Sequence, residues 1–539
     1  MHLKAMTFLR IIIRLLIFMA FSIGAEEHKK SSLMKGQGLI RGSGVEVTSL
    51  DPHKAQGISD FLVIKDIFEG LLSVDPNGNV VPGVAKSWKN HANKKFIFYL
   101  RDDLYWSDGQ SITAQDFVYS FQRAVDPQTA APYSFLFETA KILNAAEIIQ
   151  GEKSKKELGV KALDNRTLEI ILEYPVPHFT NILSNVIFFP VKESLVRQHG
   201  DRWSKPENFV GNGPFVLVNR VFNERLELLK NPYYWDSENS LLTKVTYLPI
   251  DDQNAELNRF LSGEIHVTSK VPLEDFQRMK TRYPHLMNIT DRLCTYYYGF
   301  NTTIPPFDDK RVRKALAYAI DRDIIVNNIL GQGQKEAYSF TPTSTQGFVN
   351  STPEYALISR EKRLVLARDL LASAGYNQSS SPLRLKLLYN TSENHKKIAI
   401  AIQSMWKQNL GVDVSLENQE WKVYLDSRRQ GDFEIMRGGW CALYNEPSAF
   451  LSILNSSNSL NHARYSSKKF DSLLNQALFT TSSSVRTDIY TKAEKQLSED
   501  MPIIPIFQSV SSRLISSKVI GYPNNSAGDD VPSKFLSLK

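Results

Sequence analysis

The segment 421–443 gathers side chains that can hold a ligand rich in carboxylates and amides. Trp421 and Trp440 offer flat apolar walls, and Arg437 can form a bidentate, charge-assisted pair with a carboxylate. Gly438-Gly439 lets a second backbone come close, because glycine has no side chain. These residues indicate a binding site. The alternative interpretation is a buried strand end with a core tryptophan.

The motifs of common hydrolases are absent from the sequence. It has no Gly-x-Ser-x-Gly, no His-Glu-x-x-His and no cysteine-nucleophile signature. The ten histidines are isolated, which argues against a zinc centre. We therefore expect no catalytic residues, no metal and no cofactor. A secreted hydrolase with a Ser/His/Asp triad stays open as an alternative.

Composition places the chain among soluble globular proteins. It has 539 residues, 42% hydrophobic and 22% charged, enough for two or three domains. The net charge is +7, but the basic residues are scattered along the chain. A nucleic-acid-binding protein would need a dense basic stripe with aromatic residues between. We expect no nucleic-acid partner.

The N-terminus has the pattern of a secretory signal. Lys4, Arg10 and Arg14 precede a short apolar run, and small residues follow at 22–25. We expect residues 1–25 to be a cleaved signal peptide, without a lipid anchor because no cysteine lies near the cleavage site. The only cysteines, Cys294 and Cys441, are then expected to form one disulfide.

Periodicity predicts an α/β protein whose second half is more helical. A capping box, Thr113 with Asp116, begins one helix. The expected strands are 96–101, 245–250, 383–389 and one starting at 265. The other expected helices are 256–261, 309–328, 360–374 and 396–410.

Motifs along residues 38–515 resemble the periplasmic oligopeptide-binding proteins of bacterial ABC importers, a solute-binding family for dipeptides, oligopeptides and nickel. They include, in chain order, Ser49-Leu-Asp51-Pro52-His53, Asp66-Ile-Phe68-Glu69-Gly70-Leu71, Trp106-Ser-Asp-Gly109, Gly211-Asn-Gly213-Pro214, Asn231-Pro-Tyr-Tyr-Trp235, Pro305-Pro306-Phe307, Leu388-Tyr-Asn-Thr391, Gln419-Glu-Trp421 and Arg437-x-Gly-Trp-Cys-Ala442. Each motif is weak alone, and together they are highly specific.

The resemblance implies an α/β fold of two lobes, with the ligand cleft between them and an extra inserted domain. The expected lobe I comprises residues 26–68, 193–293 and 511–539, the inserted domain 69–192, and lobe II 294–510. In this family a peptide lies in the cleft as an added β-strand, held by main-chain hydrogen bonds.

The resemblance also assigns binding roles to individual residues. Trp421 and Trp440 would form walls of side-chain pockets, while Arg428, Arg437 and His395 would meet carboxylates. A surface histidine is the alternative for His395. The remaining expected contacts are Gln56, Ile58, Tyr133, Gly439, Cys441 and Leu443, with a Cys294–Cys441 disulfide pinning the Trp440 loop.

Several family residues are replaced in this chain. The aspartate that pairs with the peptide's α-amino group, directly after Trp-Cys-Ala, is Leu443. The other replacements are Gln56 and Gly299 for glutamates, Leu330 for a lysine, and Phe507-Gln508-Ser509 for a run of tyrosines.

We therefore expect weaker or altered recognition of the peptide's N-terminus. Either Glu446 or a water replaces the acid, or the ligand is shifted, modified or more anionic. Carboxylate-rich peptides, such as the stem peptides of cell-wall peptidoglycan, would suit the retained arginines.

The expected setting follows from the same resemblance. The protein would be a periplasmic monomer that passes oligopeptides to inner-membrane ABC permease subunits. A nickel- or haem-binding relative, or a periplasmic chaperone, is the alternative on the same fold. Nickel would need a pocket histidine, for which His395 is the candidate.

Overall fold

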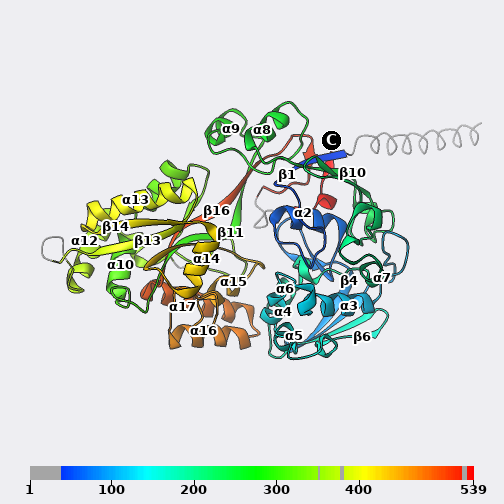
Figure 1. Ribbon diagram of the computed structural model, residues 1–539, viewed down its shortest axis with the longest axis horizontal. Helices are drawn as coiled ribbons and strands as arrows, with labels where there is room; N and C mark the ends of the chain where they lie inside the picture. The colour runs from blue at the N-terminus through cyan, green and yellow to red at the C-terminus, as the bar shows by residue number, and fades with distance from the viewer. Residues whose placement is uncertain (1–37, 350–351, 377–380, 525–530) are drawn as a thin grey trace, which may run out of the picture.

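The computed structural model describes residues 38–349, 352–376, 381–524 and 531–539. The expected signal peptide lies outside these ranges. Two bodies stand side by side, one holding most of the first half of the chain together with the C-terminal residues 531–539, the other most of the second half (Figure 1). Within the described ranges, no helix is long and apolar enough to cross a membrane.

The first body holds two four-stranded sheets. One has the spatial order β1 (Gly38–Gly44), β10 (Lys244–Pro249), β9 (Arg225–Lys230) and β8 (Phe215–Val221). The other has the order β4 (Ala85–His91), β5 (Lys95–Leu100), β7 (Thr167–Ile171) and β6 (Val160–Asp164). Its helices include α2 (Ile58–Ile67), α3 (Ala114–Val125), α4 (Phe135–Thr139), α6 (Phe179–Leu183) and α7 (Glu193–His199).

A six-stranded mixed sheet forms the second body. Its order is β12 (Lys335–Glu336), β16 (Ile503–Leu514), β11 (Met287–Phe300), β15 (Ile435–Cys441), β13 (Arg384–Asn390) and β14 (Asp413–Gln419). The main helices around it are α10 (Lys310–Tyr318), α12 (Arg360–Ser373), α13 (Glu393–Leu410), α14 (Trp421–Gln430), α15 (Ser448–Leu451), α16 (Lys468–Phe479) and α17 (Ser483–Asp500).

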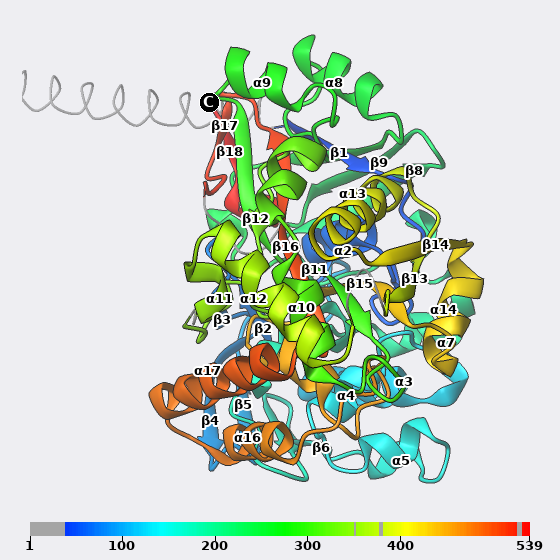
Figure 2. The same ribbon diagram turned by 90° about the vertical axis from the view of Figure 1, so that its left-hand side faces the viewer.

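The long strands β11 and β16 join the two bodies. One end of the pair belongs to a small apolar cluster with α8 (Gln253–Leu261) and α9 (Phe276–Arg282), and the other end lies in the six-stranded sheet. Figure 2 shows β16 passing from beside these helices into that sheet. Their register shifts between Asp291 and Thr295. The expected boundary 293/294 falls within this irregularity and 510/511 lies directly beside it. We propose these positions as the domain boundaries on these strands.

Most expected elements form within a few residues of their predicted bounds. The Thr113–Asp116 capping box begins α3, and Gly375 follows α12 with a φ of +91°. The prediction of one helix over 309–328 was wrong, because α10 ends at Tyr318 and a separate π-helix spans Ile324–Leu330. Arg322 lies between them, fully buried, and its Nε donates to two main-chain carbonyls outside the helix.

The prediction of a strand starting at 265 was also wrong. Val267 makes only isolated bridges, to Arg41 on one side and to Ile515 on the other. The segment lies between residues 40–42 and 514–516 and hydrogen-bonds to both, but each pairing is too short to form a strand.

A buried ion pair fixes the segment that leads into α2. Asp51 accepts from Arg123 Nη1 at 3.0 Å and Nη2 at 2.6 Å. The same carboxylate accepts from Trp203 Nε1 at 3.2 Å and from the main-chain N–H of His53 at 2.9 Å. The loop holding Gln56 is thereby tied to α3, since Arg123 belongs to that helix.

We expect Asp51→Asn to lower the free energy of unfolding by about 3 kcal/mol, because Arg123 stays buried without its counter-charge. Denaturant unfolding measures this. The control is Asp102→Asn, whose carboxylate pairs with Lys86 at 2.8 Å with an 82% exposed side chain. Its loss should leave the unfolding free energy nearly unchanged, because the pair is exposed to solvent. Equal effects of the two substitutions would contradict the prediction.

Candidate ligand-binding site

Half of strand β15 has one edge with which no other described strand pairs. Strand β13 pairs with β15 only at Ile435 and Met436. From Arg437 to Cys441, β15 pairs with β11 on its other side alone. An exposed row of main-chain donors and acceptors is a template for another extended chain.

Alternation along β15 identifies which groups face this open edge. The N–H of Ala442 donates to Leu293 of β11 at 2.8 Å, so its main chain faces β11. The carbonyl of Arg437 instead accepts from the Tyr424 hydroxyl of α14. Since neighbouring residues of an antiparallel strand alternate in direction, the main-chain groups of Gly439 and Cys441 face the open edge with those of Arg437.

Two arginines beside this edge have no carboxylate partner among the described residues. Arg437 lies over the Tyr296 ring, 4.8 Å from its centroid, and its Nη1 is 3.4 Å from Asn390 Oδ1. Arg428 lies 5.5 Å from the centroid of Tyr424. Within the described part of the chain, the Nε atoms of both arginines are buried without a hydrogen-bond partner. The arrangement leaves two positive charges open to an anionic ligand.

His395 lies beside Arg437, because both contact Tyr296. We call Arg428, Arg437 and His395, with Tyr296, Tyr424 and Asn390, the arginine wall. The Nδ1 atom of His395 is 3.4 Å from the Tyr296 hydroxyl, and the two rings are 5.6 Å apart. Burial, together with the nearby Arg437, lowers the pKa of His395 to about 4. The histidine is therefore neutral at pH 7 in the unliganded protein.

The two tryptophans lie toward either end of the segment 421–443. Trp421 stands at the start of α14, 46% exposed and stacked on Tyr424 at 5.9 Å. Trp440 is half-buried and its Nε1 donates to the carbonyl of Ala449 at 2.6 Å. Next to Trp440, the Cys294–Cys441 disulfide joins β11 to β15.

The other expected contacts lie in the first body. The Tyr133 hydroxyl donates to the carbonyl of Gln56 at 3.2 Å, and its ring is 5.6 Å from Phe61. Ile58 is 47% exposed at the start of α2. Among the described residues no hydrogen bond, ion pair or ring contact joins these side chains to the arginine wall.

Glu446 does not supply a carboxylate in place of the family's aspartate, which is Leu443 in this chain. Glu446 is buried, and its Oε2 accepts from the main-chain N–H of Ser448 at 2.8 Å. Its other oxygen is 3.5 Å from Arg486 Nε. The hypothesis that Glu446 replaces the missing aspartate was therefore wrong, because this carboxylate is buried and already has a counter-charge.

At the other positions where family residues are replaced, the side chains mostly pack against or hydrogen-bond to their own body. Leu330 is buried in the apolar core of the second body. Phe507 stacks on Tyr296 at 4.7 Å, and Gln508 accepts from Thr343 Oγ1 at 3.1 Å. A Cβ at Gly299 would meet Met436 Cε at 2.8 Å.

Sequence reasoning did not assign Tyr296, Tyr424 and Asn390 to this wall. Asn390 lies in the motif Leu388-Tyr-Asn-Thr391, and Tyr296 begins a run of three tyrosines. These patterns could have indicated them, whereas Tyr424 gave no signal beyond its helical spacing from Arg428.

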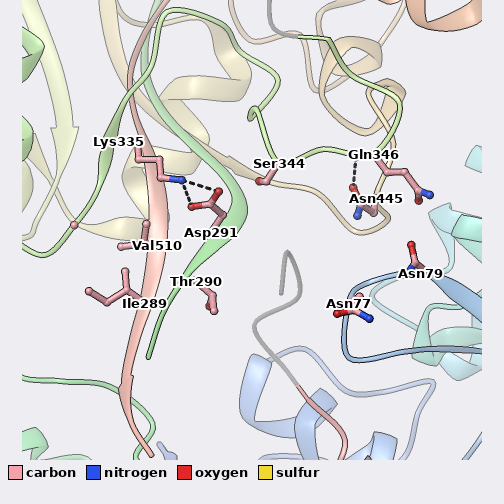
Figure 3. Close-up of a pocket in the computed structure, with 11 residues that line it drawn as sticks. Asn77, Asn79, Ile289, Thr290, Asp291, Lys335, Ser344, Gln346, Asn445 and Val510 are labelled. Carbon is pink, nitrogen blue, oxygen red and sulfur yellow. Dashed lines mark hydrogen bonds and ion pairs between the residues drawn. The ribbon is translucent and has the colours of Figure 1, made fainter. Parts of the chain in front are cut away.

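A polar cavity of about 480 Å³ lies where the second body meets the turn between β2 (Leu72–Val74) and β3 (Val80–Pro82) of the first (Figure 3). Its lining includes the Lys335–Asp291 ion pair and the side chains of Asn77, Asn79 and Asn445. Asn445 Oδ1 accepts from the main-chain N–H of Gln346 at 2.8 Å. The cavity thus borders the loop that follows Leu443.

Known proteins resemble the chain over nearly its whole length. It is 46% identical to the periplasmic oligopeptide-binding protein OppA of Escherichia coli, covering 94% of this chain and 93% of that protein. Identity to the periplasmic murein peptide-binding protein MppA of E. coli is 44%, covering 96% of each. A solved structure of MppA in an unliganded open form is similar, with a TM-score of 0.85 and 45% identity over 93% of this chain and 97% of that chain.

The model of the bacterial extracellular solute-binding proteins, family 5, matches residues 79–462. That span contains β11, β15 and the arginine wall. The chain belongs to this solute-binding protein family.

Proposed function

We propose that this protein captures oligopeptides outside the cytoplasm and delivers them to an ABC importer. The unpaired edge of β15 carries the proposal, since an extended peptide can pair there with Gly439 and Cys441 as an added strand. The printed names of the relatives, oligopeptide-binding and murein peptide-binding, support this ligand class. Main-chain pairing is independent of sequence, so it suits a binder of many peptides.

The arginine wall would hold the peptide's carboxylates. Arg437 and Arg428 have no internal counter-charge in the described chain, and a guanidinium binds a carboxylate through two parallel hydrogen bonds. Trp421 and Trp440 would flank side-chain pockets, and Tyr133 with Gln56 and Ile58 would close the cleft from the first body.

In this protein the peptide's amino end would not be recognised by an ion pair with an aspartate, as it is in the family. Leu443 cannot pair with an ammonium group, and Glu446 is occupied by Ser448 and Arg486. Burying an ammonium without its carboxylate costs about 2–5 kcal/mol, a large part of the roughly 8 kcal/mol of a micromolar complex. The preferred ligands would then be carboxylate-rich or N-terminally modified peptides, such as peptidoglycan stem peptides.

The proposed setting is the periplasm, with a cleaved signal peptide, a monomeric state and permease subunits as partners. A binding role without catalysis is consistent with the relatives, which are named as binding proteins. Fluorogenic peptides should stay intact when incubated with the protein, whereas a hydrolase would cleave them. Native mass spectrometry of the purified protein would identify a retained ligand.

We expect N-acetylation to leave the affinity of a tripeptide unchanged or to increase it, because no acid pairs with its amino group. Leu443→Asp should strengthen binding of the free amine roughly tenfold and leave the acetylated form unchanged. Calorimetric titration with trialanine and N-acetyl-trialanine measures both. Leu443→Asn is the uncharged control. A strong loss on acetylation in the unaltered protein would contradict this account of the amino end, and absence of any peptide binding would contradict the proposed function.

Arg437→Gln should weaken binding of free-acid tripeptides roughly 100-fold while C-terminal amides bind nearly unchanged, because a charge-assisted pair is lost only in the former. The matched control is Arg429→Gln. Arg429 is exposed on α14 and pairs with Asp426, so its replacement should leave both affinities unchanged. An equal loss for acid and amide would show that Arg437 does not bind the terminal carboxylate.

Acidification should strengthen the binding of free-acid peptides. The pKa of His395 is about 4 without ligand, and a carboxylate beside the ring would raise it. Binding then takes up protons, so affinity increases as pH falls from 7 to 5, by roughly twofold for a rise of about one pKa unit. Titrations at several pH values measure this, with the peptide amide and His395→Gln as controls that should show no increase. A weaker complex at pH 5 would reverse the assigned role.

A further inference from the structure

A contact away from β11 and β16 also joins the two bodies. It lies between α6 with its flanking residues, 178–185, and the loop 443–448 that connects β15 to α15. Figure 1 shows α6 and α15 on facing sides of the two bodies. Asn181 and Asn185 each donate to a main-chain carbonyl of this loop, at 3.3 and 3.4 Å. These amides do not titrate, so their hydrogen bonds hold at any pH of interest.

A buried histidine is also part of this contact. The rings of His178 and Tyr444 are parallel to within 3°, with centroids 5.5 Å apart, and both residues are less than a tenth exposed. His178 Nε2 lies 3.3 Å from Ser448 Oγ. Within the described part of the chain, its Nδ1 is buried without a hydrogen-bond partner. Separating the two bodies here would expose the ring to water.

The carboxylate nearest to this histidine already has a counter-charge. Glu446 Oε2 lies 3.8 Å from His178 Nδ1. The other oxygen of Glu446 lies 3.5 Å from Nε of Arg486, which belongs to α17. Because the carboxylate and the guanidinium balance each other, a proton on His178 would add an uncompensated charge to a buried site. Burying such a charge is unfavourable.

The other groups around the ring carry no charge. Among the described residues, only Glu446 and Arg486 act electrostatically on the histidine. The segment 178–185 contains no other titratable residue. The loop and α17 add Tyr444 and Tyr490, and burial raises the pKa of both hydroxyls, so they stay neutral. Protonation of the histidine is therefore the one event in this cluster that acidification toward pH 5 brings about.

These surroundings make the ring harder to protonate than it is in water. Burial lowers the pKa of His178 below its ordinary value of about 6.5, while Glu446 opposes this shift and Arg486 adds to it. Once the contact is broken, the ring regains its ordinary pKa. The separated state thus binds the proton more tightly. The contact is therefore fully stable above pH 6.5 and loses stability as the pH falls below that value.

We propose that residues 178–185 and 443–448 form a latch between the two bodies that acid releases. The latch holds while His178 is neutral and loosens when the ring takes up a proton. It restricts the relative motion of the bodies at neutral pH and frees that motion in acid, while β11 and β16 keep the bodies joined. None of the latch residues belongs to the arginine wall.

The test is hydrogen exchange of the protein without ligand at pH 7.5 and pH 5.5, with each rate divided by the intrinsic rate of an unfolded amide at the same pH. In the unaltered protein, protection of residues 178–185 and 443–448 should fall at pH 5.5, by up to roughly tenfold for one group of pKa 6.5. Protection of β5, which is paired along both edges, should stay constant. Unchanged or greater protection of the two latch segments at pH 5.5 would overturn the proposal.

Two variants separate titration from packing. His178→Phe keeps a ring against Tyr444 but has no titratable nitrogen, so protection should be the same at both pH values. In Arg486→Gln, a protonated His178 would become the counter-charge of Glu446, so acid should no longer loosen the latch. The matched control is His285→Phe, at an exposed residue outside the contact, which should keep the fall in protection. A fall as large as in the unaltered protein in either of the first two variants, or its loss in the control, would overturn the proposal.

The latch and the proposed peptide binding can fail independently. Hydrogen exchange without ligand reports on the latch alone, whereas peptide titrations at neutral pH report on binding while the latch is intact. Absence of peptide binding would contradict the proposed function and leave the pH dependence of exchange to decide whether His178 controls the latch.

Discussion

The molecule is organised around a strand that is paired along one edge and left open along the other. Between Arg437 and Cys441, β15 must keep its register on β11 without support from β13. Seven consecutive residue pairs with β11 and the disulfide at Cys294 supply that support. The remaining main-chain groups need a partner, because unsatisfied polar groups are costly once water is excluded. A second extended chain satisfies them regardless of its sequence.

The surrounding side chains determine what else such a chain must carry. Arg437 rests on Tyr296 and Arg428 lies near Tyr424, so aromatic faces replace carboxylates as their neighbours. An aromatic face attracts a cation more weakly than an ion pair does and leaves its hydrogen-bond donors available. The wall is thus preformed, and it stays positive until an anion arrives.

Sequence patterns located this wall because many of its parts are close in the chain. Arg428, Arg437 and Trp440 belong to one short segment. Turns and caps such as Thr113–Asp116 could also be predicted, because they depend only on residues that are close in the sequence. The open edge could not be predicted, since it depends on where β13, far away in sequence, stops pairing. The break after Tyr318 and the burial of Glu446 likewise follow from distant partners, the carbonyls around Arg322 and the guanidinium of Arg486.

The two uncompensated guanidinium groups also bear on how fast ligands arrive. Charges of one sign in a cleft steer oppositely charged molecules toward it, and this long-range attraction fades once the Debye length falls to about 10 Å near 0.1 M salt. Under the proposed function, capture of anionic peptides should therefore slow as ionic strength rises, while dissociation, governed by short-range contacts, changes little. A cell in dilute surroundings would load such a protein faster than one in brine, with the same cleft and the same ligand.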